Sequence, residues 1–220
     1  MFNDRYGLTQ AVLEGRKTMT RREVKAPRRF RGQDVNGYWV YRHPATHEVV
    51  EVCMKDYDDA EIEGGQIRPK YDFDEIVAVA QSYKDTGYAP NDLADIIRNG
   101  DTVFIPFKEH KGWANKMFVR WDYMLYQIRI TDIRIERLQD ISDEDCLREG
   151  IRYIPEIDRY YFERTDREEG FYFTSPRAAF AELIDRVSGR GTWDRNPYVV
   201  AYEFELLSSP LNHESEQTNQ

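Results

Sequence analysis

The longest alternating run in the sequence, MLYQIRITDIRIERL at residues 124–138, most constrains the fold. Isoleucines alternate along it with polar residues, at Ile128, Ile130, Ile133 and Ile135. This period of two is typical of a strand with one buried face. The alternation slips once, at Thr131-Asp132, and a single β-bulge would absorb the slip. We therefore expect a long strand here, with a β-rich domain built around it.

Shorter patterns complete an α+β organisation. Further strands are expected at residues 75–81, from Asp101, and at residues 193–206. Helices are expected at residues 4–14, from Pro90 to Gly100, at residues 142–149, and from Ser175-Pro176 to Gly189. In ISDEDCLREGI, Ser142 and Asp145 have capping-box spacing, and Gly150 ends the helix after two turns. Glu149 is then the last helical residue.

The remaining segments are rich in glycine, proline, charge or aromatic residues. Residues 26–72, with a hairpin within YWVYRHPATHEVVEVCMK, and residues 152–174 are expected to be insertions. The sequence predicts a single domain over residues 1–207 and a disordered tail at 208–220.

Composition excludes several classes of function. No apolar run approaches the roughly 20 residues of a membrane span, and the N-terminus lacks the features of a signal peptide, so we expect a cytoplasmic protein. Cys53 and Cys146 form no CxxC pair, and the four histidines have no ligand cluster at metal spacing. We predict neither a metal nor a cofactor.

Charge is distributed unevenly along the chain. The net charge is −9, yet residues 16–31 hold eight of the 31 Lys and Arg residues and one of the 40 Asp and Glu residues. Such a basic strip can seat phosphates, as RNA binding requires. Alternatively, it is a solvated loop whose cations pair with acids elsewhere in the fold.

One part of that strip carries a family resemblance. The loop EGRKTMTRR, which follows a short helix, resembles the Gly-x-Lys-x-x-Glu-x-Arg motif of the ASCH family, with Gly15, Lys17 and Arg22 matching and Thr20 replacing the glutamate. The resemblance implies a PUA-like β-barrel with short flanking helices. With threonine at this position, the loop resembles the Gly-Arg-Lys-Thr-x-Thr loop of the small bacterial N4-acetylcytidine amidohydrolases. Their catalytic lysine, threonine and glutamate would fall on Lys17, Thr20 and Glu149.

A second resemblance runs nearly end to end, to ASCH proteins of phages and prophages. It is carried by AVAQSY, by IERLQDIS at the end of the long strand, and by the Trp-x-x-Asn-Pro segment at residues 193–197. It covers the core and leaves out both insertions. The family implies a nucleobase, nucleoside or RNA ligand, in a cleft between residues 15–22 and 142–149.

Amide hydrolysis is chemically reasonable for these residues. Repulsion from Arg16, Arg21 and Arg22, assisted by burial, would lower the pKa of Lys17 and make it a base. Thr20 would attack or align water and Glu149 would protonate the leaving amine, or Glu149 would activate water while Lys17 holds the oxyanion. The same arginines would bind ligand, and Tyr83 and Trp121 would stack on a base. The alternative is an RNA-binding module without chemistry.

Overall fold

The structure, a computed structural model, describes residues 2–46, 48–86, 95–98, 101–104, 113–116, 119–165 and 171–207. The chain forms two compact units. The main unit comprises Asn3–Ile76 and Arg129–Leu206, and the minor unit comprises Met1–Phe2, Val77–Ile128 and Leu207–Gln220. Within the described ranges, no helix is both long and apolar enough to cross a bilayer. The predicted tail at 208–220 lies outside the described residues.

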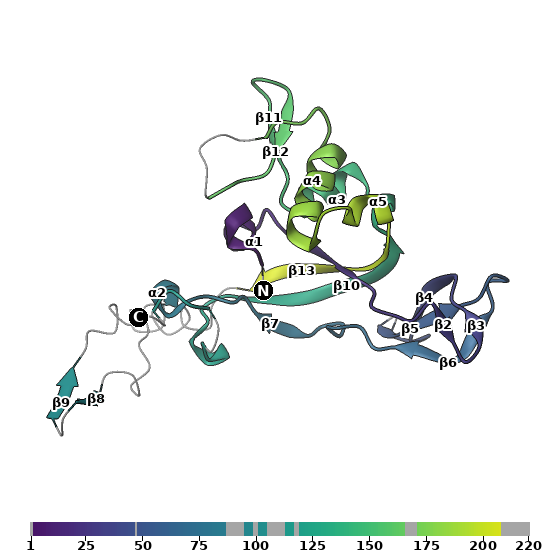
Figure 1. The fold of residues 1–220 in the computed structure, drawn as a ribbon, viewed down its shortest axis with the longest axis horizontal. Coiled ribbons are helices and arrows are strands. Elements are labelled where there is room, and N and C mark those ends of the chain that lie inside the picture. Colours follow the sequence, from purple (N-terminus) through teal and green to yellow (C-terminus); the bar gives the residue numbers. More distant parts are fainter. Residues whose placement is uncertain are drawn as a thin grey trace, which may run out of the picture. The chain divides into compact units, whose positions relative to one another are not determined.

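A curled four-stranded sheet forms the core of the fold. Its strands lie in the order β1 (Met19–Glu23), β13 (Tyr198–Leu207), β10 (Gln127–Arg137) and β7 (Ile76–Ala78). β1 and β13 are antiparallel, with Thr20 opposite Tyr202. Figure 1 shows β10 and β13 curving together like half of a barrel. The predicted α+β class, with more strand than helix, is confirmed at this level.

The long predicted strand is β10, and its burial follows the slip in the sequence. Ile128, Ile130 and Ile133 are all buried, whereas Thr131 is exposed. The change from an even to an odd spacing between buried isoleucines is the change that the slip at Thr131-Asp132 predicts. The final strand begins later than expected, because Thr192–Arg195 form the short helix α5.

The predicted helices and their ends are largely confirmed. In α3 (Asp143–Arg148) the hydroxyl of Ser142 accepts a hydrogen bond from the amide of Asp145, and in α4 (Pro176–Ser188) Ser175 caps in the same way. Glu149 was predicted to be the last helical residue. In the structure α3 ends one residue earlier, at Arg148, and Glu149 is its C-cap. The expected N-terminal helix consists of the 3-10 turn η1 (Asp4–Tyr6) and α1 (Leu8–Leu13).

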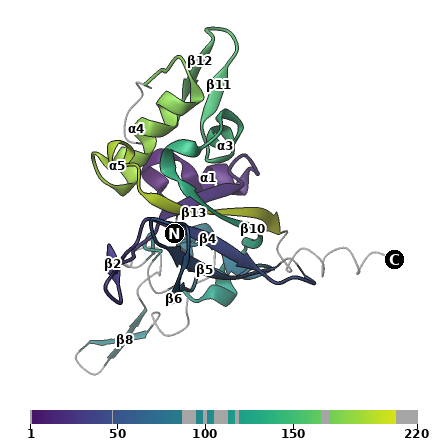
Figure 2. The same cartoon turned by 90° about the vertical axis from the view of Figure 1, so that its right-hand side faces the viewer.

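The core sheet is covered on both faces. Four consecutive residues of β13, from Val199 to Tyr202, are buried, although their side chains point alternately to the two sides. In both views, α1, α3, α4 and α5 lie on one side of β10 and β13, and β4–β6 lie on the other (Figures 1 and 2). We call these sides the helix face and the insertion face.

The segment expected to be the first insertion, residues 26–72, builds the second cover, and we call it the insertion. It contains β2 (Arg29–Phe30), β3 (Gln33–Asp34), and the three-stranded sheet of β4 (Gly37–Arg42), β5 (Val49–Lys55) and β6 (Glu61–Ile67). The predicted hairpin is confirmed as β4 and β5. The insertion is anchored to the core, because the amide of Lys70 donates to the hydroxyl of Tyr202 at 2.8 Å and Tyr38 packs edge-on against Tyr198.

The second insertion forms a smaller hairpin. It pairs β11 (Arg152–Ile154) with β12 (Arg159–Tyr161), and Phe173 adds a bridge to Tyr160. The 3-10 turn η5 (Leu138–Asp140) connects β10 to the segment before α3.

The minor unit corrects one prediction. It contains α2 (Tyr83–Thr86), the 3-10 turn η4 (Trp121–Tyr123), and the antiparallel pair β8 (Asp95–Arg98) and β9 (Asp101–Phe104). The helix expected from Pro90 to Gly100 is therefore wrong over Asp95–Arg98, and residues 90–94 lie outside the described ranges. The sequence Asn99-Gly100 between two β-branched runs is a strong signal for a two-residue hairpin, and it outweighs the helical spacing. The strand expected from Asp101 is confirmed as β9.

Candidate functional site

The loop after α1 delivers Lys17 into the interior. Gly15 adopts a left-handed φ of 70°, and the amides of Arg16 and Lys17 both donate to the carbonyl of Ala11 at 2.9 Å. These bonds satisfy the end of the helix and turn the chain inward. The Lys17 side chain is 2% exposed. A buried lysine requires partners, because an unpaired ammonium is costly to remove from water.

Those partners come from the end of α3. The Lys17 ammonium donates to Oε2 of Glu149 at 2.6 Å and to the backbone carbonyl of the same residue at 2.8 Å. Gly150 follows with a φ of 108°, and a Cβ there would lie 3.2 Å from Leu8 Cδ2. The absence of a side chain at Gly150 thus lets the end of α3 approach α1 and Lys17 closely.

Arg21 extends the pair into a buried ionic cluster. Its fully buried guanidinium contacts three carboxylates, at 2.7 Å from Glu136, 2.9 Å from Asp145 and 3.0 Å from Glu149. Bidentate and multiple charge-assisted bonds are the arrangement that best offsets the loss of water around a guanidinium. Asp145 also accepts from Arg134 at 2.9 Å. The cluster therefore links β1, β10 and α3 on the helix face.

Burial, rather than repulsion from the neighbouring arginines, is the main cause of the lowered pKa of Lys17. Desolvation lowers the pKa of Lys17 below its ordinary value of 10.5, Glu149 opposes this shift, and Arg22 and Arg21 add smaller lowering effects. The prediction that repulsion dominates is corrected on this point. Arg16 does not contribute in the predicted way, because it pairs instead with Glu14 at 2.7 Å.

The sequence predicted a loop for the whole of EGRKTMTRR. Thr20 instead lies in strand β1. Consecutive side chains of a strand point to opposite faces. Since Arg21 reaches Glu149 on the helix face, Thr20 and Arg22 leave β1 toward the insertion face. The structure thus brings Lys17 and Glu149 together and directs Thr20 to the other side of the sheet.

The segments expected to border a cleft are in direct contact. The amide of Thr18 donates to the carbonyl of Arg148 at 2.9 Å, and Nε of Arg148 donates to the Thr18 hydroxyl at 3.2 Å. Together with the Lys17–Glu149 pair, these bonds close the loop against α3. The cleft predicted between residues 15–22 and 142–149 stays a prediction, and it requires these bonds to open.

The two predicted stacking residues belong to the minor unit. Tyr83 is buried there and lies 6.4 Å from the ring of Tyr123, whereas Trp121 is 71% exposed. Of the predicted ligand-binding arginines, Arg21 is saturated by carboxylates, and Arg22 lines a cavity on the insertion face.

Sequence reasoning missed the acidic partners of Arg21. Glu136 occupies a polar position of the alternating strand, and Asp145 was assigned a capping role. Their types offered no signal, because acids on a strand or in a first helical turn are ordinary surface residues. In the described part of the chain, no three His, Cys, Asp or Glu side chains gather into a group that could hold a metal ion.

Comparison with known proteins adds no relative. No family model, no curated protein and no solved structure matches the chain.

Proposed function

We propose that this protein is a PUA-like barrel of the ASCH type that hydrolyses the amide of an N4-acylated, cytidine-like nucleoside. The observation that carries the proposal is the buried contact of 2.6 Å between Lys17 and Glu149. A lysine whose pKa is lowered by burial, touching a carboxylate, provides a cation and a proton acceptor within one site. The curled sheet and the order of the elements that carry the two residues support the ASCH assignment.

The geometry favours one of the two mechanisms that the sequence left open. Since Thr20 leaves the opposite face of β1, water is a better nucleophile than its hydroxyl. Glu149 would take a proton from water as the oxygen attacks the acyl carbon, and the Lys17 ammonium would stabilise the oxyanion. Glu149 would then return the proton to N4 as the carbon–nitrogen bond breaks. The products are a carboxylic acid and the free cytidine-like nucleoside.

Access to the pair is the main physical requirement. Lys17 and Glu149 are 2% and 5% exposed, so the loop after α1 must move away from α3 before substrate can enter. Gly15 has a φ of 70° and nothing within 4 Å of its Cβ position, so we expect the loop to hinge there. We expect slow turnover whose rate depends on this opening.

The test is hydrolysis of N4-acetylcytidine by the purified protein, followed by chromatography of released cytidine. Glu149→Gln keeps the shape of the side chain but removes the proton acceptor, so turnover should fall by about a hundredfold or more. Lys17→Met should reduce it similarly. Asp143→Asn serves as the matched control, because Asp143 is an exposed acid of the same helix.

Folding of each variant is checked by circular dichroism, so that loss of activity is separated from loss of structure. Turnover that persists in both Glu149→Gln and Lys17→Met would reject the assignment. If folded wild-type protein releases no cytidine but binds single-stranded RNA with a strong salt dependence, the non-catalytic RNA-binding module is the better description.

A further inference from the structure

A cavity of about 560 Å³ lies on the insertion face, away from the Lys17–Glu149 pair. Its walls come from β1, β13, the end of α4, and the insertion, which contributes Val52 and the segment Ile67–Lys70. The volume is within the range of about 300–1,000 Å³ that small-molecule sites occupy. The insertion is thus part of a built pocket, and it is one of the two parts of the chain that the family resemblance does not cover.

The polar lining of this cavity is cationic. Arg22, Lys25 and Lys70 line it and, within the described part of the chain, form no ion pair. The other lining charges are compensated: Arg21 by its three carboxylates, Arg68 by Asp72, and Glu23 by Arg195. Three cations without an ion pair around one hollow concentrate a positive potential there, although Nζ of Lys70 also lies over the Tyr71 ring, 5.2 Å from its centroid. That potential favours an anion.

Arg22 is the most enclosed of the three cations. Its Nε atom is buried and has no hydrogen-bond partner among the described residues, as is also true of Nε in Arg129 and Arg134. Because this nitrogen is closed off from a water-sized probe, a ligand in the cavity would meet the terminal nitrogens of the Arg22 guanidinium. A phosphate oxygen is a suitable acceptor, because guanidinium and phosphate geometries match.

The rest of the lining is apolar and uncharged. Val52, Val200 and Tyr202 present hydrocarbon and ring surface to the cavity. Burial raises the pKa of the Tyr202 hydroxyl, and this group accepts from the amide of Lys70 at 2.8 Å, so it adds no negative charge. A ligand with a ring would bury its apolar surface here while its anionic group meets the cations.

We propose that this cavity binds a phosphorylated small molecule that carries a ring, with Arg22, Lys25 and Lys70 holding the phosphate and Val52, Val200 and Tyr202 contacting the ring. The site is separate from the Lys17–Glu149 pair and does not rest on the proposed hydrolysis. Its failure and that of the hydrolase are distinguishable, because the two use different residues on different faces of the core sheet.

The experiment is isothermal titration of the full chain with cytidine 5′-monophosphate, cytidine and inorganic phosphate, in a buffer without phosphate. Cytidine 5′-monophosphate should bind at least about tenfold more tightly than cytidine, because only it carries the charged acceptor. It should also bind more tightly than inorganic phosphate. Arg22→Gln and Lys70→Met should each weaken its binding about tenfold.

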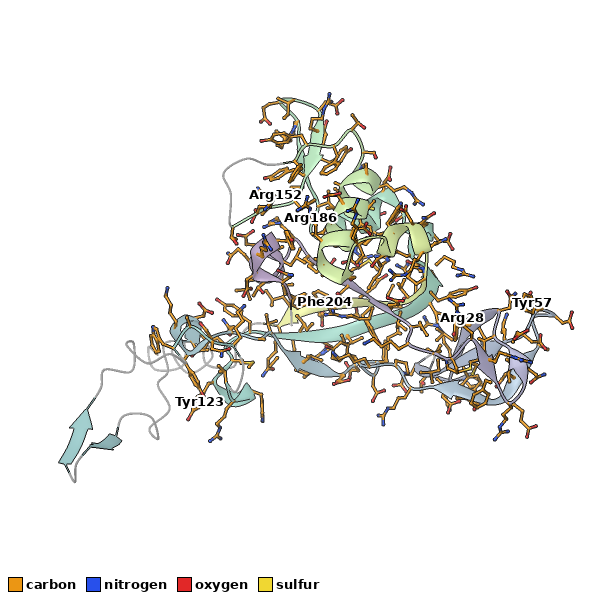
Figure 3. All side chains as sticks on the ribbon, viewed as in Figure 1. Arg28, Tyr57, Tyr123, Arg152, Arg186 and Phe204 are labelled. Atoms are coloured by element: carbon orange, nitrogen blue, oxygen red, sulfur yellow. The ribbon has the colours of Figure 1, made fainter. Side chains whose placement is uncertain are left out.

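Arg28→Gln is the matched control. Arg28, which is labelled in Figure 3, is an exposed cation of the same basic strip and does not line the cavity. The control changes the net charge by the same amount and should leave the affinity unchanged. Equal affinities for cytidine and its monophosphate, or unchanged binding in Arg22→Gln and Lys70→Met, would overturn the proposal. Folded variants, judged by unchanged Tm, are required in each arm, and Lys70→Met is expected to keep its fold because Lys70 is exposed.

Discussion

Lys17 and Glu149 are 132 positions apart in the chain, and their side chains meet at 2.6 Å with both residues buried. Such a pair is weak evidence for stability by itself, because the desolvation of two charges offsets much of their attraction. Arg21 changes this balance, since its guanidinium binds the other oxygen of Glu149 at 3.0 Å. Glu149 therefore holds two buried cations, and the roles of Lys17 and Glu149 in stability are unequal.

That inequality predicts an asymmetric pair of variants. Glu149→Met leaves Lys17 buried without its carboxylate and should lower the free energy of unfolding by about 3 to 5 kcal/mol. Lys17→Met should cost less, because Glu149 keeps Arg21. The double variant should cost less than the sum of the two, as expected for residues in contact. Urea unfolding measures all three; additive costs would show that the contact contributes no coupling.

The pH dependence of stability should carry a signature of Lys17. Its pKa in the folded protein is lowered below the ordinary 10.5, mainly by burial, so between these two values the unfolded chain binds more protons than the folded one. The free energy of unfolding then rises with pH in that window. Wild type should therefore gain stability relative to Lys17→Met as pH rises through this window toward 10.5. A difference that stays constant or shrinks in urea titrations would contradict this.

Gly150 and Gly189 provide a matched pair for testing close packing beside the site. Both have a φ that L side chains rarely adopt, 108° and 107°, so replacement by alanine strains the backbone at each position. At Gly150 the new Cβ would also lie 3.2 Å from Leu8 Cδ2, whereas nothing lies within 4 Å at Gly189. Gly150→Ala should therefore be the more destabilising in thermal unfolding. If both variants lose the same stability, α1 can shift away from the new Cβ at Gly150 without an energetic cost.

Local patterns in the sequence predicted much of the fold. The alternation of isoleucines identified β10, and serine and glycine at their capping positions bounded α3 and α4. These signals are local, so no knowledge of the tertiary structure was needed. The helix expected before Gly100 is wrong over Asp95–Arg98 for an equally local reason, because these residues pair with Asp101–Phe104 as β-strands and Asn-Gly between two β-branched runs is a sequence signal for a hairpin.

The site was less predictable because its contacts are not local. The family resemblance placed Lys17 and Glu149 together, but no spacing indicated that Glu136 and Asp145 meet at Arg21. Charge counting had the same limit for the basic strip. Several of its cations pair with acids, as one interpretation expected, whereas Arg22 and Lys25 line a cavity whose other wall is an insertion. Only the folded chain brings these segments together.

The two thiols should report on opening of the site. Burial raises the pKa of Cys53 to about 11 and that of Cys146 to about 12, and both residues are buried, so neither forms an accessible thiolate near neutral pH. Folded protein should take up iodoacetamide very slowly at about pH 8, while unfolded protein should take up two groups by mass spectrometry.

Cys146 lies within α3, between the N-cap Ser142 and the C-cap Glu149. Its side chain is buried, so its labelling requires α3 to separate from the core. Glu149→Met weakens that attachment and should speed the labelling of Cys146 more than that of Cys53, whose strand β5 lies in the insertion. Equal acceleration at both thiols would indicate global unfolding. Selective acceleration at Cys146 would show that α3 opens on its own, which is the motion that a substrate of the Lys17–Glu149 pair requires.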